Sequence, residues 1–313
     1  MVVNHMNICY VNRTIATIYE KPDTVMTKTY KVEGNNSEQT YTVSAISDEG
    51  LYGMPLLILE ERGDWYKVRT HYSYEGYIAK NDVIFKQKIG LQMVADGQYV
   101  DVLSIPKVQG VPLISLTKGC LIETTEETVN GYRKVILLDD RVGFIPEKYL
   151  TKKIFPTDAF CAEGTAADDR AFKIYLKKLL NVHFEGSEEK FRNAVCATAL
   201  SYIGTQYRWG GKSPLGIDCS GMTSMSYMLN GIFTYRDAKV VEGYPVKEIP
   251  RKDMKEGDLL YFTGHIALYL GEGLYIHSTA RAGSNGMDIN TRQHNRFNLC
   301  TYKKHNSHNI SYS

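Results

Sequence analysis

Three side chains have the types and the spacing that nucleophilic chemistry requires: Cys219, His265 and His277. The segment Asp218-Cys219-Ser220-Gly221 follows a glycine-rich loop at 209–216. Because aspartate is a preferred N-cap residue, we expect a helix to open at Cys219. In the first turn of a helix the macrodipole favours the thiolate over the thiol, and the thiolate is the reactive form of cysteine.

His265 and His277 lie in two apolar runs, 264–270 and 274–278, which flank the turn-like triplet Gly271-Glu272-Gly273. This composition predicts a β-hairpin. The histidines are 12 positions apart and centred on the turn. They are therefore expected to be cross-strand or diagonal neighbours on one face of a sheet. One imidazole can then act as a base towards Cys219 while the other fixes its tautomer and orientation.

A zinc site built from Cys219, His265 and His277 is the alternative use of these residues. No second cysteine or third histidine stands at a ligand-like spacing, so neither a metal nor a cofactor is expected. The other cysteines form no closely spaced pair in a chain of 313 residues, which is too long to need disulfide bonds for stability. They are expected to be buried, inert thiols: Cys9, Cys120, Cys161, Cys196 and Cys300.

The sequence from about 191 to 302 predicts an α+β domain, which would position Cys219, His265 and His277. Helices are expected over about 190–203 and 219–229, and strands near 258–262, 265–270, 274–279 and 297–302. Met222, Met225 and Leu229 share a helix face with Cys219, so the cysteine should point into the body of the domain. A linker with a helix over 166–180 is predicted within 153–190, and 303–313 forms a polar tail.

The first half of the chain contains an internal repeat. Trp65-Tyr66-Lys67-Val68 precedes Gly76-Tyr77-Ile78, and Tyr132-Arg133-Lys134-Val135 precedes Gly143-Phe144-Ile145; in both copies the aromatic residue and the glycine are 11 positions apart. Short strands punctuated by glycine and proline predict two small β-barrels, at 1–88 and 89–152. The segment 27–53 is expected to be a loop insertion in the first barrel.

The chain has 37 basic and 35 acidic residues and a formal net charge of +2. This balance gives no reason to expect nucleic acid or a membrane surface as a partner. The N-terminal residues lack the basic and apolar regions of a signal peptide, and no later stretch has the length of a membrane span. A soluble, cytoplasmic protein is therefore expected, unless an export signal has been trimmed. The sequence does not indicate the oligomeric state.

Five motifs in order resemble those of the NlpC-type cysteine peptidases: 207–211 (Tyr-Arg-Trp-Gly-Gly), 218–221, 256–259 (Glu-Gly-Asp-Leu), 264–269 and 275–278. The similarity covers roughly 190–302, and the repeat resembles the bacterial SH3-like domains that accompany wall hydrolases. The whole chain thus resembles γ-D-glutamyl-L-diamino-acid endopeptidases with two such domains. The resemblance implies a papain-like core, with Cys219 as nucleophile, His265 as base and His277 as the third polar residue.

The same resemblance implies substrate-binding roles for Tyr207, Asp218, Ser220, Asp237 and Tyr74. Tyr207 matches the tyrosine that lines the nucleophile's pocket, although simple packing is the alternative. Asp218 and Ser220 match positions that bind a free N-terminal L-Ala, and Asp218 could equally be only an N-cap. Asp237 borders that subsite, and Tyr74, or else Tyr72 or Tyr77, closes it.

Met54 is a departure, because the relatives commonly carry an acidic residue at that position in the Leu-Tyr-Gly-x-Pro step. This leaves open whether a free substrate amine is strictly required, and Asp48 or Glu49 could compensate.

The implied reaction is hydrolysis of the γ-D-Glu to L-diamino-acid bond in murein tri- or tetrapeptides, in muropeptide recycling. Two alternatives remain: an exported or phage-like peptidoglycan lysin that uses the SH3-like domains to hold the wall, and a wall-peptide-binding module with an inactive peptidase domain. The sequence does not indicate which diamino acid is preferred.

Overall fold

The computed structural model describes residues 7–31, 37–155, 157, 186–291 and 298–302. They form two compact units: an N-terminal unit of residues up to 152 together with 209–211, and a C-terminal unit of the described residues in 153–208 and beyond 211. No helix in the described ranges is long and apolar enough to cross a membrane. The predicted helix at 166–180 and the polar tail lie outside the described residues.

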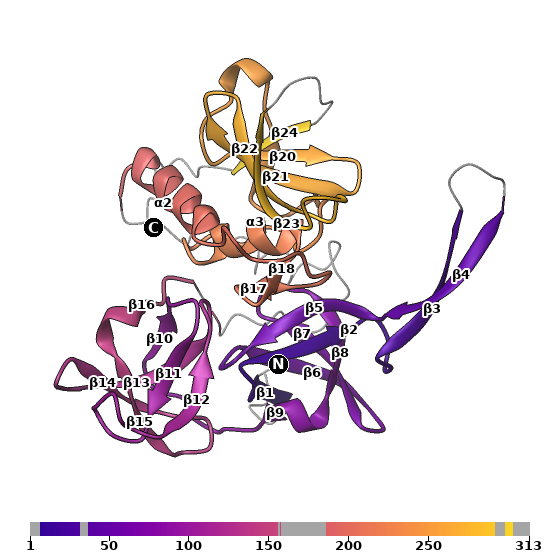
Figure 1. Cartoon of the computed structure of the whole chain (residues 1–313). Helices are drawn as coiled ribbons and strands as arrows, with labels where there is room; N and C mark the ends of the chain where they lie inside the picture. Colours follow the sequence, from indigo (N-terminus) through magenta and orange to yellow (C-terminus); the bar gives the residue numbers. More distant parts are fainter. Residues whose placement is uncertain (1–6, 32–36, 156, 158–185, 292–297, 303–313) are drawn as a thin grey trace, which may run out of the picture. The chain divides into compact units, whose positions relative to one another are not determined.

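The N-terminal unit contains two seven-stranded antiparallel sheets with the same topology (Figure 1). The first has the order β5-β2-β8-β7-β6-β1-β9, and the second has the order β12-β11-β15-β14-β13-β10-β16. The strands of the first are β1 (Ile8–Val11), β2 (Ile15–Tyr19), β5 (Ile46–Leu51), β6 (Pro55–Arg62), β7 (Trp65–Thr70), β8 (Glu75–Ala79) and β9 (Val83–Ile84). Those of the second are β10 (Gln92–Ala95), β11 (Val100–Leu103), β12 (Pro112–Leu116), β13 (Leu121–Val129), β14 (Tyr132–Ile136), β15 (Val142–Pro146) and β16 (Leu150–Lys152).

The sequence repeat is confirmed as a repeat of structure. Its two halves form the adjacent strands β7 and β8 in one sheet and β14 and β15 in the other. Val68 and Ile78 are fully buried in the first sheet, as Val135 and Ile145 are at the matching positions of the second. The region is β-rich, as expected; its assignment to SH3-like barrels, with the boundaries 1–88 and 89–152, stays a prediction.

The prediction of a loop insertion at 27–53 is corrected by the structure. Strands β3 (Val25–Lys31) and β4 (Glu38–Ser44) form a hairpin of their own, which projects from the unit in Figure 1, and 46–51 is an edge strand of the first sheet. The hairpin side chains are mostly exposed, and Thr29 pairs with Thr40 across it. The hairpin buries almost no apolar residue, and apart from Tyr41 and Val43, which alternate with polar residues in β4, its sequence has little of the alternation by which a half-buried strand is recognised.

The two sheets of the N-terminal unit are joined through the segment that follows β5. The Leu138 N–H donates to the buried hydroxyl of Tyr52 at 2.8 Å, and the Leu121 N–H donates to the Tyr52 carbonyl at 2.7 Å. Gly53 has φ +78, and a Cβ there would stand 2.0 Å from the Leu121 carbonyl oxygen. Only glycine allows the two backbones to approach this closely.

The C-terminal unit consists of a six-stranded antiparallel sheet with two helices beside it. The sheet order is β19-β24-β20-β21-β22-β23, and helices α2 (Glu188–Leu200) and α3 (Cys219–Met228) pack on each other and on β21 (Figure 1). The strands are β19 (Val246–Glu248), β20 (Leu259–Phe262), β21 (His265–Gly271), β22 (Leu274–Thr279), β23 (Gly286–Thr291) and β24 (Asn298–Tyr302). A short ladder of β17 (Lys212–Ser213) and β18 (Gly216–Ile217) precedes α3. The sequence analysis did not predict β23.

A buried ion pair attaches α2 to the start of β20. Asp258 is fully buried, and its carboxylate accepts from Arg192 Nη1 at 2.8 Å and from the Lys255 N–H at 2.8 Å. The same Arg192 nitrogen donates to the Glu256 carbonyl at 2.7 Å. Each charge and each polar atom here has a partner, which offsets the desolvation that burial imposes.

We predict that Tyr52→Phe destabilises the N-terminal unit by about 1–3 kcal/mol, because the buried Leu138 N–H loses its acceptor. The change would appear as a lower midpoint of urea unfolding. Tyr99→Phe is the matched control, since Tyr99 is exposed and should leave the midpoint unchanged. Equal midpoints for the two variants would contradict the role given to Tyr52.

Candidate active site

Cys219 is the first residue of α3, and the side chain of Asp218 caps this helix. Asp218 Oδ1 accepts from the Gly221 N–H at 2.5 Å, which confirms the predicted N-cap. Cys219 itself is buried, as are Met222 and Met225 on the same helix face. The predicted placement of the cysteine, in the first turn and directed into the domain, is therefore confirmed.

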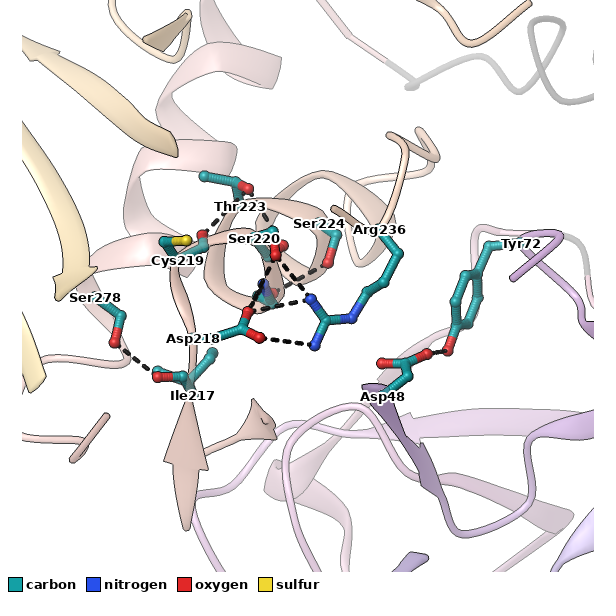
Figure 2. Close-up of polar contacts among 11 residues, drawn as sticks. Asp48, Tyr72, Ile217, Asp218, Cys219, Ser220, Thr223, Ser224, Arg236 and Ser278 are labelled. Atoms are coloured by element: carbon teal, nitrogen blue, oxygen red, sulfur yellow. Dashed lines mark hydrogen bonds and ion pairs between the residues drawn. The ribbon is translucent and has the colours of Figure 1, made fainter. Parts of the chain in front are cut away.

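Asp218 is also paired with Arg236, the residue that precedes Asp237. Arg236 Nη1 lies 3.1 Å from Asp218 Oδ1 and donates to Ser220 Oγ at 2.9 Å, while Nη2 lies 3.3 Å from Oδ2. The Ser220 hydroxyl in turn donates to Asp218 Oδ1 at 3.2 Å. Figure 2 shows this network at the start of the helix, with the guanidinium reaching Asp218 from the side away from Cys219 in that view.

The two histidines are brought together by the hairpin of β21 and β22. Leu268 is the register partner of Ile276, so His265 and His277 are diagonal neighbours on one face of the sheet. His265 Nε2 and His277 Nδ1 are 2.6 Å apart, which is a hydrogen bond between the rings. The predicted pairing of these histidines is confirmed.

The turn of that hairpin is unusual because all three of its residues have positive φ. Gly271, Glu272 and Gly273 adopt φ values of 96, 50 and 82. Two glycines carry this conformation at little cost, as the composition of the triplet predicted.

The surroundings of the histidines are largely apolar and aromatic. The same sheet face carries the buried cluster Leu260, Ala267, Tyr269 and Tyr275. The ring of Phe262 lies 5.8 Å from that of His265, and the ring of Tyr275 lies 5.2 Å from that of His277. Such surroundings disfavour the charged imidazolium.

Burial determines the protonation states of Cys219 and His265 in the protein without substrate. It raises the pKa of Cys219 to about 11, and the charge of Asp218 adds to this; the backbone N–H groups of Ile266 and Ser220 and the charge of Arg236 act in the opposite direction. Burial also lowers the pKa of His265 to about 4, with a smaller effect from His277. Both groups are therefore neutral at pH 7, and ionisation requires that the proton pass from sulfur to imidazole within the site.

The Ile266 contact places the sulfur beside the strand that begins with His265. Ile266 directly follows His265, and its backbone N–H interacts with Cys219. Helix α3 packs on both β21 and β22. The nucleophile candidate thus lies beside the residue that follows the base candidate in β21.

Several backbone links hold the strands of the site against the segment before the cysteine. The buried Ser278, next to His277, donates through its hydroxyl to the Ile217 carbonyl at 2.6 Å. The Met287 N–H donates to the Thr205 carbonyl, and the Tyr207 N–H to the Asn285 carbonyl. These bonds fix the distance between the histidine strands and the start of α3.

The predicted substrate-binding residues are only partly brought together. Tyr207 is a bridge partner of Ile217, and its pKa is raised by burial and by the nearby Cys219, so it lies beside the nucleophile. Asp237 is half-buried and interacts with the hydroxyl of Tyr235.

Tyr74 belongs to the N-terminal unit, as do Asp48, Glu49 and Met54, so their assignment to the substrate site stays a prediction. Met54, Asp48 and Glu49 are all buried there, and Asp48 accepts a hydrogen bond from the Tyr72 hydroxyl (Figure 2).

Asn290, on β23, is a polar neighbour of the histidines that the sequence analysis missed. Its Nδ2 lies 3.1 Å from His277 Nε2, at the end of the ring opposite to His265. The available signal was the alternation of Asp288 and Asn290 with the apolar Met287 and Ile289, which is typical of a short strand. Within the described part of the chain, no three His, Cys, Asp or Glu side chains are grouped so as to hold a metal ion.

Comparison with known proteins gives consistent matches. The sequence model of the NlpC/P60 family matches residues 204–302. Dipeptidyl-peptidase 6 of Lysinibacillus sphaericus is 44% identical over 256 residues, which span 78% of this chain and 83% of that protein. A γ-D-glutamyl-L-lysine dipeptidyl-peptidase of Bacillus cereus is 23% identical over 257 residues, or 74% of this chain and 67% of its own.

Among solved structures, an NlpC/P60 family protein from Bacillus cereus matches with a TM-score of 0.68. The match covers 95% of this chain and 100% of that one at 16% identity, so it shows a shared fold.

We predict that Asp218→Ala lowers stability by about 3 kcal/mol or more, because it removes both the cap and the carboxylate that faces the buried Arg236. Ser187→Ala is the matched control: it removes the cap of α2 but no ion pair, and should cost about 1 kcal/mol. Urea unfolding followed by circular dichroism measures both. An equal loss of stability in Asp218→Ala and Ser187→Ala would show that the ion pair with Arg236 adds nothing to the cap.

A second prediction concerns pH. Because the pKa of His265 is lowered to about 4, its ring should stay neutral as pH falls from 7 to 5 and become protonated only near pH 4. Once protonated, His265 can no longer act as a base, so kcat/KM should fall with a midpoint near pH 4. NMR titration of the His265 ring measures this directly, with the urea-unfolded protein as reference near 6.5. A midpoint near 6.5 in the folded protein would contradict the effect of burial.

Proposed function

The chain belongs to the NlpC/P60 family of cysteine peptidases, and from this premise we propose that it hydrolyses the bond between γ-D-Glu and an L-diamino acid in cell-wall peptides. The observation that carries the proposal is the placement of Cys219 at the start of a buried helix, beside the backbone of Ile266, which follows His265 in β21; His265 is in turn hydrogen-bonded to His277. The relatives named as peptidases of this kind support peptidoglycan peptides as the substrate class. The name of the Bacillus cereus relative supports the γ-D-glutamyl bond in particular.

In the proposed reaction Cys219 is the nucleophile and His265 the base. The proton passes from the thiol to His265, and the thiolate attacks the γ-carbonyl carbon of D-Glu. His265 then protonates the amine of the diamino acid as the C–N bond breaks, leaving a γ-glutamyl thioester. Water gives a proton to the same histidine, hydrolyses the thioester and regenerates the thiol.

The helix start supplies the electrostatic part of this proposal. The tetrahedral intermediate carries an oxyanion, and backbone N–H groups in the first turn of α3 are available to stabilise it. Tyr207, which lies beside the sulfur, is a second candidate donor for the oxyanion. The role of His277 is to orient His265 through the bond between the two rings.

Asp218, Ser220 and Asp237, with Tyr74, are proposed to bind the N-terminal L-Ala of a free tri- or tetrapeptide. Such specificity is what a muropeptide-recycling enzyme requires, and a carboxylate is suited to hold an ammonium group.

A second candidate function is cleavage of intact peptidoglycan, whose peptides have no free N-terminus. One observation favours it: the Asp218 carboxylate is already engaged by the Gly221 N–H, by Ser220 and by the guanidinium of Arg236. A buried cation beside Asp218 weakens its attraction for a substrate ammonium.

We predict that the protein releases L-Ala-D-Glu from L-Ala-γ-D-Glu-L-diamino-acid peptides only when the N-terminus is free. Mass spectrometry of the products from free and N-acetylated peptides distinguishes the two candidates, with Cys219→Ala as the control for the nucleophile. Equal cleavage of both peptides would favour the wall-lysing function. Absence of cleavage in either case would refute the proposed substrate class.

A further inference from the structure

The hydrogen-bond chain from His265 to His277 continues outwards to Asn290 and Asp288 on β23. Asn290 Nδ2 lies 3.1 Å from His277 Nε2, and the side chain of Asn290 also hydrogen-bonds to Asp288. We propose that Asn290 is a positioning residue whose amide must turn before His265 can accept the proton of Cys219, and that Asp288 holds this amide in the resting orientation. The inference rests on the proposed function of Cys219 and His265.

Asp288 fixes which end of the Asn290 amide faces the histidine. Its carboxylate accepts from the Ile289 N–H at 2.9 Å and from the Ser284 hydroxyl at 3.1 Å, in addition to the Asn290 side chain. These hydrogen bonds, the one from Asn290 above all, lower the pKa of Asp288, so the group is a carboxylate and only accepts. Asn290 must therefore direct its NH₂ group towards Asp288.

The remaining hydrogen of that NH₂ group determines the tautomer of His277. Because Asn290 Nδ2 donates, His277 Nε2 must accept. A neutral imidazole that accepts at one nitrogen carries its proton on the other, so His277 is protonated at Nδ1 and donates to His265 Nε2. A neutral His265 then has its proton on Nδ1, the ring nitrogen that His277 does not engage.

This arrangement keeps the site inactive at rest. In the proposed reaction His265 takes the thiol proton through Nδ1, because His277 engages its Nε2. With a proton already on Nδ1, His265 cannot accept another there. To take the thiol proton, a neutral His265 must carry its one ring proton on Nε2 and donate to His277 Nδ1, and His277 must then donate from Nε2. In this change of tautomers the proton of His277 Nδ1 passes to His265 Nε2, the proton of His265 Nδ1 leaves to water, and water supplies a proton to His277 Nε2. In that state the side-chain oxygen of Asn290, Oδ1, must accept the hydrogen bond from His277 Nε2.

An asparagine side chain can either donate to His277 Nε2 or accept from it, because its amide is nearly symmetric in shape. Turning it exchanges Oδ1 and Nδ2 with little change in packing, but it gives up the hydrogen bond to Asp288 and brings two oxygens together. The cost of the turn is thus set by Asp288. The other described neighbours of the His277 ring are His265 on β21 and Tyr275 on its own strand, and neither contacts its Nε2 among the described interactions.

The first test needs no substitution. The nitrogen chemical shifts of the His277 ring, measured by ¹⁵N NMR of the intact protein at pH 7, distinguish a protonated from an unprotonated Nε2. We expect Nδ1 to be protonated and Nε2 to be unprotonated. Protonation of His277 Nε2 in the protein without substrate would overturn the inference, because Asn290 Oδ1 would then already accept a hydrogen bond from it.

The second test measures the reactivity of Cys219 with iodoacetamide at pH 7, followed by mass spectrometry of the peptide that contains it. In Asp288→Asn, the residue at 288 can donate to Asn290 Oδ1, so the amide is free to turn. Alkylation should be faster by about 5-fold, the factor expected for one net hydrogen bond. Thr291→Ala is the matched control, since Thr291 is exposed and points to the other face of β23.

A double variant separates this effect from the simple loss of a negative charge. Asn290→Leu removes the amide, so the acceleration produced by Asp288→Asn should disappear when both changes are combined. An acceleration that persists in the double variant, or no acceleration in Asp288→Asn, would overturn the role of the amide. Because alkylation needs no peptide substrate, these results are independent of whether the proposed peptide is cleaved.

Discussion

The carboxylate of Asp218 determines where α3 begins, and the position of the sulfur depends on that beginning. One oxygen caps the helix through the Gly221 N–H, and both oxygens face the guanidinium of Arg236. A helix start held only by a cap would fray, and the cysteine in its first turn would move with it. The buried ion pair ties that turn to a segment further along the chain, so the nucleophile is held by long-range structure.

Burial gives this site its chemical character as well as its rigidity. The same apolar sheet face that aligns the two histidines also disfavours their charged forms, and the pKa of His277 is lowered by it too. A thiolate and an imidazolium form here only as a pair, because each compensates the other's desolvation. The hydrogen-bond partners of the imidazoles therefore have a larger influence on reactivity than they would have at an exposed site.

The features that the sequence predicted are those marked by local pattern. Asp218 before an apolar helix, the Gly271-Glu272-Gly273 turn and the repeat around Trp65 and Tyr132 each depend on neighbouring residues, and the structure has them as expected. Strand β23 escaped prediction although Met287 and Ile289 alternate with polar residues, because the alternation is only four residues long and Ile289 is exposed. Arg236 and Asn290 could not be assigned their contacts from the sequence, since these follow from chain packing and from the register of His277 with Asp288.

The contacts of Tyr52 and Gly53 have a consequence for how far the two sheets of the N-terminal unit can be separated from each other. The two copies share a repeat, but Gly53 lies against Leu121 so closely that neither surface is complete without the other. Because the sheets are joined in this way, the loss of either would expose buried backbone polar groups of the other. The two sheets therefore form one structural module, and cutting the chain between residues 84 and 92 would not give two independent domains, although this segment is a linker between strands.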